Sequence, residues 1–396
     1  MNKRLFWAWK DEGLAMTTTS NEAFRLFDGL LRQYVSWADC EHLGGIENTI
    51  SALQKADSDA MLTLGLGAMG TARSVALDEA YRNDIEQLVK DANASGNERE
   101  KMHARAISLF ANGGMTAACQ QWERILRETP NDLLAIKFAH DAYFYLGDRT
   151  SIRDSISRVL PHWNTSAPCY RNPELLLFSS SYLHGMYAFG LEECEEYEKA
   201  EKEALKGLEL RREDAWATHA LVHCMEMNGR VDEGIKFMET TVQDWSPCFM
   251  LACHNYWHTA LLYLEKQNYE TVLSYYDSEI ASRSKSGAML DLVDAASILF
   301  RLHIEGVDVG ERWNALLPVA EAHIDGKQFN IIYDNVSGYA EFSGKRKRFS
   351  GMRDERRGRG GFTRILIEER NSIKKNSSIS KRLMEQFNLL SKMDEK

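Results

Sequence analysis

The chain has only six prolines in 396 residues, and its seven cysteines are scattered along the sequence. Because proline interrupts helices and is common in the turns between strands, its scarcity beside 15 methionines favours long helices over short strands. An odd number of cysteines without a CxxC pair is not expected of a disulfide framework. It fits reduced thiols in the cytoplasm.

Long apolar runs are also missing. No stretch approaches the roughly 20 apolar residues that a helix needs to cross a bilayer. The opening "MNKRLFWAWKDEGLAM" has no apolar segment of signal-peptide type before Lys10 and Asp11. We therefore predict a cytoplasmic protein that has no membrane contact and no signal peptide.

Charge is unevenly distributed along the chain. Residues 343–396 contain 16 Lys or Arg and 7 Asp or Glu, a net charge of +9 against −10 for the whole chain. We predict two regions, a helical repeat domain at residues 1–323 and a divergent basic tail at residues 324–396 that is disordered or forms short helices. The tail contains "GKRKRFSGMRDERRGRGGFTR", a composition typical of a solvated tail or of weak nucleic-acid contact through phosphates.

A helical repeat motif lies in "GGMTAACQQWERILRETPND", from Gly113 to Asp132. Ala118, Trp122 and Pro130 have the offsets of the second half of a 34-residue tetratricopeptide repeat. In such a repeat the small residue lets two helices cross, the bulky residue fills the space between hairpins, and proline ends the second helix.

The same register predicts a helix from Leu133 that ends at Gly147, and a later turn at Asn228 and Gly229. Near the N-terminus, the spacing of Thr19 and Glu22 predicts a capping box at a helix start. We therefore predict an all-α fold, a tetratricopeptide-like α-solenoid in which about five or six helical hairpins form a right-handed superhelix.

Four longer stretches carry a more specific resemblance: "TTTSNEAFRLFD", "FAHDAYFYLGD", "MLACHNYWHTAL" and "AMLDLVDAASILFRLHIEGVDVGERW". In this order and at these spacings they resemble the tetratricopeptide repeat protein 38 family. The resemblance covers roughly residues 6–323, and the tail departs from it. It implies an α-helical repeat protein without established catalytic activity, and it supplies no catalytic residues.

Two pairs of histidines have helical spacing: His219 and His223 in "THALVHCMEM", and His254 and His258 in "ACHNYWHTA". Residues four apart lie on one face of a helix, one turn apart. In the repeat register both stretches form the first helix of a hairpin, which lines the concave face of a superhelix. We therefore expect both pairs to face one groove.

The groove is expected to contain further polar and aromatic side chains from these and neighbouring helices. Its predicted lining is Lys137, Asp141, His219, His223, Glu226, His254, Tyr256, Trp257, His258, Asp291 and Asp294. The leading interpretation is an interaction scaffold whose groove receives a protein or peptide segment, or another ligand, without cofactor or catalysis.

An enzyme is the alternative interpretation. The four histidines are candidate zinc ligands that carboxylates could support, and His and Asp side chains could perform general acid–base catalysis. However, "HCME" is not HExxH, because no second histidine follows Glu226 at the required step. We therefore expect no metal, and a metal-dependent or acid–base enzyme in the groove remains the second interpretation.

Two other patterns are not expected to be sites. "GLGAMG" at residues 65–70 matches GxGxxG but lacks the strand that precedes a dinucleotide-binding loop, so its glycines are predicted to let helices approach closely. Cys253 and His254 are adjacent, and adjacent side chains on a helix diverge by about 100°, which excludes a Cys/His nucleophile pair.

Overall fold

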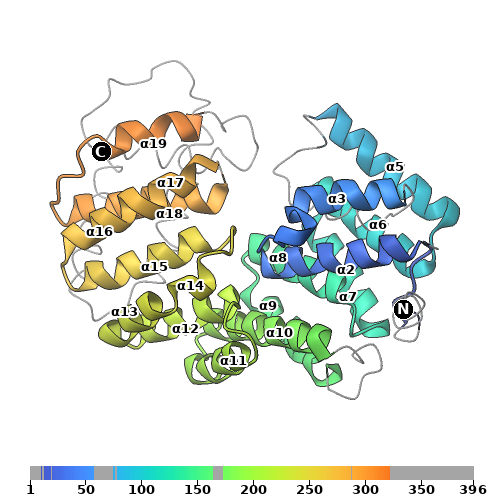
Figure 1. Cartoon of the computed structure of the whole chain (residues 1–396), viewed down its shortest axis with the longest axis horizontal. Helices are drawn as coiled ribbons and strands as arrows, with labels where there is room; N and C mark the ends of the chain where they lie inside the picture. The colour runs from blue at the N-terminus through green and yellow to red at the C-terminus, as the bar shows by residue number, and fades with distance from the viewer. Residues whose placement is uncertain are drawn as a thin grey trace, which may run out of the picture. The chain divides into compact units, whose positions relative to one another are not determined.

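The computed structural model describes residues 13–18, 20–57, 78–163, 173–286 and 288–321, together with Lys10 and Val75. Within these residues every regular element is a helix (Figure 1). None of the described helices is long and apolar enough to cross a membrane. The glycine motif at residues 65–70 and the basic tail at residues 324–396 lie outside the described residues.

The chain divides into two compact units, Met1–Cys224 with Thr241–Ala252, and Met225–Thr240 with Cys253–Lys396. The division falls inside α12 (Ala215–Met227), which is a single continuous helix. The predicted boundary near residue 323 lies outside the described residues and stays a prediction.

The first unit begins with a helical hairpin and continues as a series of helices. Besides most of α12 its elements are α2 (Asn21–Ser36), η1 (Glu41–Leu43), α3 (Gly45–Ala56), α5 (Glu79–Ser95), α6 (Glu98–Ala111), α7 (Met115–Glu128), α8 (Leu133–Leu146), α9 (Arg149–Val159), η2 (Leu160–His162), α10 (Pro173–Glu193), α11 (Tyr197–Leu210) and α14 (Val242–Trp245).

The second unit contains the end of α12 and further helices. These are α13 (Val231–Thr240), α15 (Ala252–Glu265), α16 (Tyr269–Tyr275), the π-helical segment η4 (Tyr276–Ile280), α17 (Ala281–Arg283), η5 (Ser284–Ser286), α18 (Met289–Ile304) and α19 (Arg312–Glu321).

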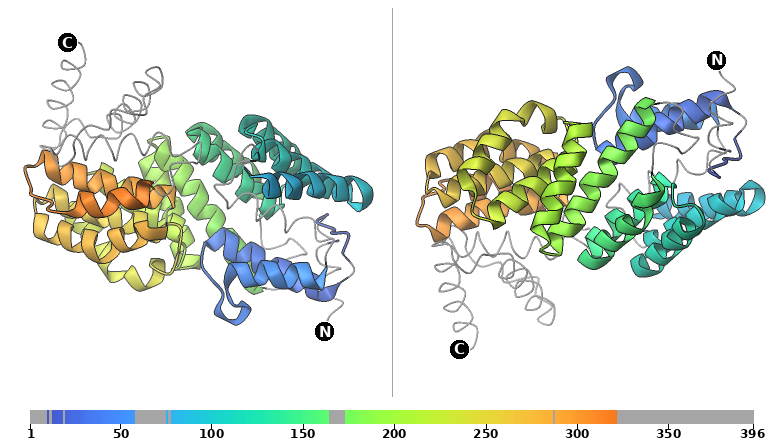
Figure 2. Two further views of the ribbon diagram at one scale, coloured as in Figure 1. Left: turned by 90° about the horizontal axis from the view of Figure 1, so that it is seen from above. Right: turned by 90° about the horizontal axis from the view of Figure 1, so that it is seen from below.

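Helices that follow each other in the sequence pack against each other. From α5 to α11 each described helix contacts the next one, and in the second unit α18 contacts α19 (Figure 2). This succession of helical hairpins confirms the predicted fold class, an all-α, tetratricopeptide-like α-solenoid.

The repeat residues predicted from the sequence lie in the core of the first unit. Ala118 and Trp122 on α7 are fully buried. The Trp122 ring packs on Phe138 of α8 with centroids 5.5 Å apart, and on Phe110 of α6 at 6.3 Å. Trp122 thus fills the space between consecutive helices, as the motif predicts.

The predicted turn at Gly147 is also present. Gly147 ends α8 with a φ of 65°, in the left-handed region that a side chain disfavours. The predicted turn at Gly229 is likewise left-handed, with a φ of 70°. At the N-terminus, α2 is capped by Ser20, whose Oγ accepts from Ala23 N at 3.2 Å, one residue later than the predicted capping box.

Replacing Gly147 by alanine is expected to destabilise the protein by about 1–2 kcal/mol, because an L side chain is strained at this φ. Urea denaturation followed by circular dichroism measures the loss. Gly147→Asn is the matched control, since asparagine tolerates the left-handed conformation better. Equal losses in both variants would show that backbone strain is not the cause.

Candidate metal centre

The first histidine pair lies on α12. The rings of His219 and His223 are edge-on to each other with centroids 4.6 Å apart. His223 Nδ1 lies 2.8 Å from Oε1 of Glu192, a buried residue of α10. His219 packs against Phe189 of α10, with centroids 5.3 Å apart. Helix α10 therefore supplies both a carboxylate and an aromatic support behind this pair.

The second pair lies on α15 and has the same arrangement. The rings of His254 and His258 are edge-on with centroids 4.7 Å apart. His258 Nδ1 lies 3.0 Å from Glu226 Oε2, and His254 Nδ1 lies 3.0 Å from both carboxylate oxygens of Asp294 on α18. Trp257 stacks on the His254 ring with planes 10° apart.

Glu226 connects the two pairs. It lies on α12, three residues after His223, and its carboxylate contacts His258 on α15. A continuous helix fixes Glu226 relative to His219 and His223. The contact between Glu226 and His258 joins α15 to the end of α12 within the second unit.

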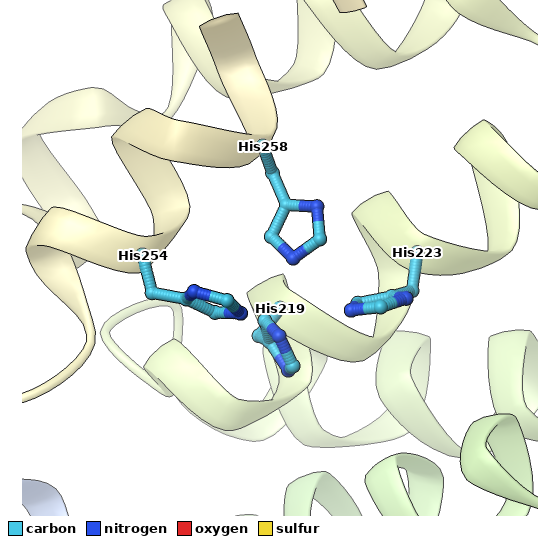
Figure 3. A group of neighbouring side chains, drawn as sticks. All are labelled: His219, His223, His254 and His258. Carbon is cyan, nitrogen blue, oxygen red and sulfur yellow. The ribbon is translucent and has the colours of Figure 1, made fainter. Parts of the chain in front are cut away.

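Each of the four histidines offers a ring nitrogen, and these four nitrogens lie within 4.8 Å of one another. Figure 3 shows the rings pointing toward one another from α12 and α15. Four points at this separation fit within a sphere of about 2.9 Å radius, whereas zinc–nitrogen bonds are about 2.0–2.1 Å long. Movements of roughly 1 Å per ring would complete a coordination shell.

The carboxylates determine which nitrogen is available. A carboxylate only accepts hydrogen bonds at neutral pH, so Nδ1 of His223, His254 and His258 carries the proton and donates it. The Nε2 lone pair is then the one that can bind a metal. Carboxylate–histidine–metal arrangements of this kind fix the tautomer and the ring orientation and raise the basicity of the ligand.

Burial acts on the acidic groups near α15. It raises the pKa of Asp294, although the contact with His254 opposes the effect. It also raises the pKa of Asp291 to about 6, against a hydrogen bond from Ser286 Oγ, which donates to Asp291 Oδ2 at 3.1 Å. Asp294 thus supports His254, whereas Asp291 contacts a neighbouring turn.

Lys137 and Asp141, predicted to line the groove, are buried elsewhere in the first unit. The Lys137 ammonium donates to the Asp141 carboxylate, Tyr34 Oη donates to Asp141 Oδ2 at 2.8 Å, and Trp37 covers the ammonium at 3.8 Å from its ring centroid. Burial lowers the pKa of Lys137. Helix α2 covers this part of α8, so the groove prediction is wrong for these two residues.

The two aromatic residues of α15 that were predicted to line the groove have different neighbours. Trp257 stacks on His254, whereas Tyr256 is buried against Tyr275, with centroids 6.1 Å apart, beneath the guanidinium of Arg283. Only Trp257 therefore belongs to the surroundings of the histidines.

Glu192 is a site residue that the sequence did not reveal. It lies in "GLEECEEYEK", an acidic run at the end of α10 that reads as a solvated surface. Glu192 is buried, whereas its acidic neighbours are not. The only sequence feature that could have indicated Glu192 is its position on α10. This helix is the first of the preceding hairpin and therefore corresponds to α12 one repeat earlier.

Replacing Glu226 by glutamine is expected to weaken metal binding about 10- to 100-fold, because the carboxylate that orients His258 is lost while its shape is kept. Competition with a chromophoric chelator measures the affinity. Glu203→Gln is the matched control, since Glu203 lies 2.7 Å from Nδ1 of His184, which is outside the four-histidine group. A Glu226→Gln affinity equal to that of the control would remove Glu226 from the centre.

No protein-family model matches the chain. Similar solved structures include yeast Tom70, with 13% identity over 91% of this chain and 87% of that one and a TM-score of 0.36. The human IFIT1 dimer with PPP-AAAA has 14% identity over 82% of this chain and 91% of that one, with a TM-score of 0.31. Similarity at this level does not bear on the histidine cluster.

Proposed function

We propose that this helical repeat protein binds one divalent transition metal ion, with zinc as the first candidate, through Nε2 of His219, His223, His254 and His258. The observation that carries the proposal is the grouping of four imidazole nitrogens within 4.8 Å. Of the two interpretations drawn from the sequence, the proposal follows the one in which the four histidines are metal ligands rather than a polar lining.

The donor atoms define the class of metal. Mg²⁺ and Ca²⁺ take oxygen ligands, whereas four neutral imidazoles suit Zn²⁺, Cu²⁺, Ni²⁺, Co²⁺ or Fe²⁺. A tetrahedral zinc ion would hold the four nitrogens about 3.3 Å apart, closer than the 4.8 Å within which they lie in this structure. The carboxylates of Glu192, Glu226 and Asp294 compensate the charge of the ion from behind the rings.

A scaffold role remains compatible with the metal centre. Helical repeat proteins commonly bind partners on their helical faces, and here the large side chains of Phe144 and Tyr145 are exposed at the end of α8. As a second function, we propose that the chain binds a protein or peptide partner in the cytoplasm. We also propose that the chain belongs with the tetratricopeptide repeat protein 38 family, on the stretches quoted above.

Elemental analysis of the purified full chain tests the metal proposal. About one equivalent of zinc or another transition metal is expected, and EDTA should lower the Tm by roughly 5 °C, since an ion at 100 times its Kd adds about 2.7 kcal/mol to stability. Adding zinc back should restore the Tm. Absence of metal, together with a Tm unchanged by EDTA and by added zinc, would refute the proposal.

A further inference from the structure

Tyr34 of α2, and Trp37 directly after its end, contact helices that lie far along the sequence. Tyr34 Oη donates to Asp141 Oδ2 of α8 at 2.8 Å. Lys137 Nζ of α8 lies 3.8 Å from the centroid of the Trp37 ring, and the Trp216 ring of α12 lies 5.1 Å from it. Helix α2 also contacts α10. One short segment therefore contacts α8, α10 and α12, through residues that all belong to the first unit.

The hairpin of α2 and α3 packs on these helices mainly through α2. Helix α3 packs mainly against α2 and η1, whereas α2 also contacts α10. Phe24, Phe27 and Leu30 of α2 are buried, whereas Arg25 on the same helix is exposed. An amphipathic helix that lays its apolar side into a groove is a common form of peptide recognition. Within the first unit, α2 therefore has the form of a bound helical ligand.

The surface that α2 covers contains a buried ion pair. The fully buried ammonium of Lys137 donates to the Asp141 carboxylate, and the Trp37 ring covers it. Burying two charges costs free energy that their attraction offsets only in part, and burial accordingly lowers the pKa of Lys137. When Tyr34 and Trp37 withdraw, water reaches the pair and hydrates both charges. This contact of α2 is therefore less costly to open than a purely apolar one.

The same side of α8 continues beyond the part that α2 covers. Lys137, Asp141 and Tyr145 follow one another at steps of four residues, so they lie along one side of the helix. The first two are buried, whereas Tyr145 is 52% exposed. A partner helix that also covers Tyr145 buries apolar surface that α2 leaves exposed. This additional contact favours the partner in competition with α2.

We propose that α2 is an intramolecular ligand that blocks a partner-binding face on α8, α10 and α12, and that the partner is an amphipathic helix with aromatic anchors spaced like Tyr34 and Trp37. The inference rests on the partner binding proposed above and names the class of partner, and it is independent of the metal centre. Because α2 is part of the same chain, its effective concentration at this face is high. A free helix therefore binds well only after the anchors of α2 have been weakened.

The test measures the binding of a fluorescein-labelled synthetic peptide with residues 14–57 to the full chain by fluorescence anisotropy. Tyr34→Phe combined with Trp37→Ala in the full chain should bind this peptide at least about tenfold more tightly than the wild type, because its own α2 competes less well. A peptide that carries the same two substitutions should lose this gain. Arg25→Ala is the matched control, since it removes only an exposed ion pair with Glu22 on α2 and should leave the affinity unchanged.

Circular dichroism shows whether the double variant is folded. If it is not, Tyr34→Phe alone makes the same test, because it removes the hydrogen bond to Asp141 and keeps the ring. Equal affinity of the wild type and the folded variant for the peptide would overturn the blocking by α2 while supporting partner binding. No binding by the folded variant would refute this face as a partner site, and with it the class of partner.

Discussion

Replacing His219 and His258 together by alanine is expected to lower the zinc affinity of the full chain by about a thousandfold or more. Structural zinc sites bind with roughly 10–16 kcal/mol, so losing two of four ligands removes about 5 kcal/mol or more, and each 1.4 kcal/mol is about tenfold in Kd. These two histidines come from different helices and are the most buried of the four. Their loss therefore breaks the centre on both sides.

Competition titration with a chromophoric zinc chelator measures this loss, and circular dichroism shows whether the variant is folded. His184→Ala is the control, because His184 also contacts a carboxylate, 2.7 Å away on Glu203, yet is not in the cluster. If the alanine pair does not fold, His223→Ala with His254→Ala makes the same test on the more exposed ligands. An affinity no weaker than in the His184 variant would contradict a four-histidine centre.

The helical hairpins could be predicted from the sequence because their signals are local. The offset between Ala118 and Trp122, and the glycines at 147 and 229, act within one or two turns of a helix, and the structure has all of them where predicted. The start of α2 was misplaced by one residue because neighbouring Thr and Ser are chemically similar caps, and sequence alone does not choose between them.

The site was predictable only in part. The spacing of four residues indicated that the histidines of each pair lie on one face of their helix. The repeat register led us to expect that both pairs face the same groove. Contacts between distant residues escaped the same reasoning: Glu192 lies in an acidic run, and Tyr34 reaches Asp141 from 107 residues away. Periodicity reports which face of a helix is apolar or polar, but not which distant helix covers it.

The largest stability loss outside the metal centre is expected on replacing Asp132 by alanine. This carboxylate is fully buried and caps α8, accepting from Ala135 N at 3.1 Å. It also lies 2.6 Å from Arg99 Nε and 2.9 Å from His103 Nε2 on α6. It therefore joins two helices of the first unit through one buried group.

We expect Asp132→Ala to cost about 3–5 kcal/mol, because it leaves the largely buried guanidinium of Arg99 without its counter-charge. Asp132→Asn should cost less, since the amide keeps a hydrogen-bond acceptor for the cap. Urea denaturation measures both variants. Glu98→Ala is the control: it removes only the exposed ion pair with Lys101 on the same helix and should cost less than about 1 kcal/mol.

The same carboxylate predicts a pH dependence. Burial would raise the pKa of Asp132, but the charges of Arg99 and His103 outweigh it, so the pKa lies below its usual 3.8. A depressed native pKa means that the contribution is complete above the unfolded value and is lost as pH falls below about 4. The unfolding free energy of the wild type should therefore fall more steeply than that of Asp132→Ala below this pH. Parallel pH profiles, or an Asp132→Ala loss no greater than that of Glu98→Ala, would show that this buried ion pair does not stabilise the fold.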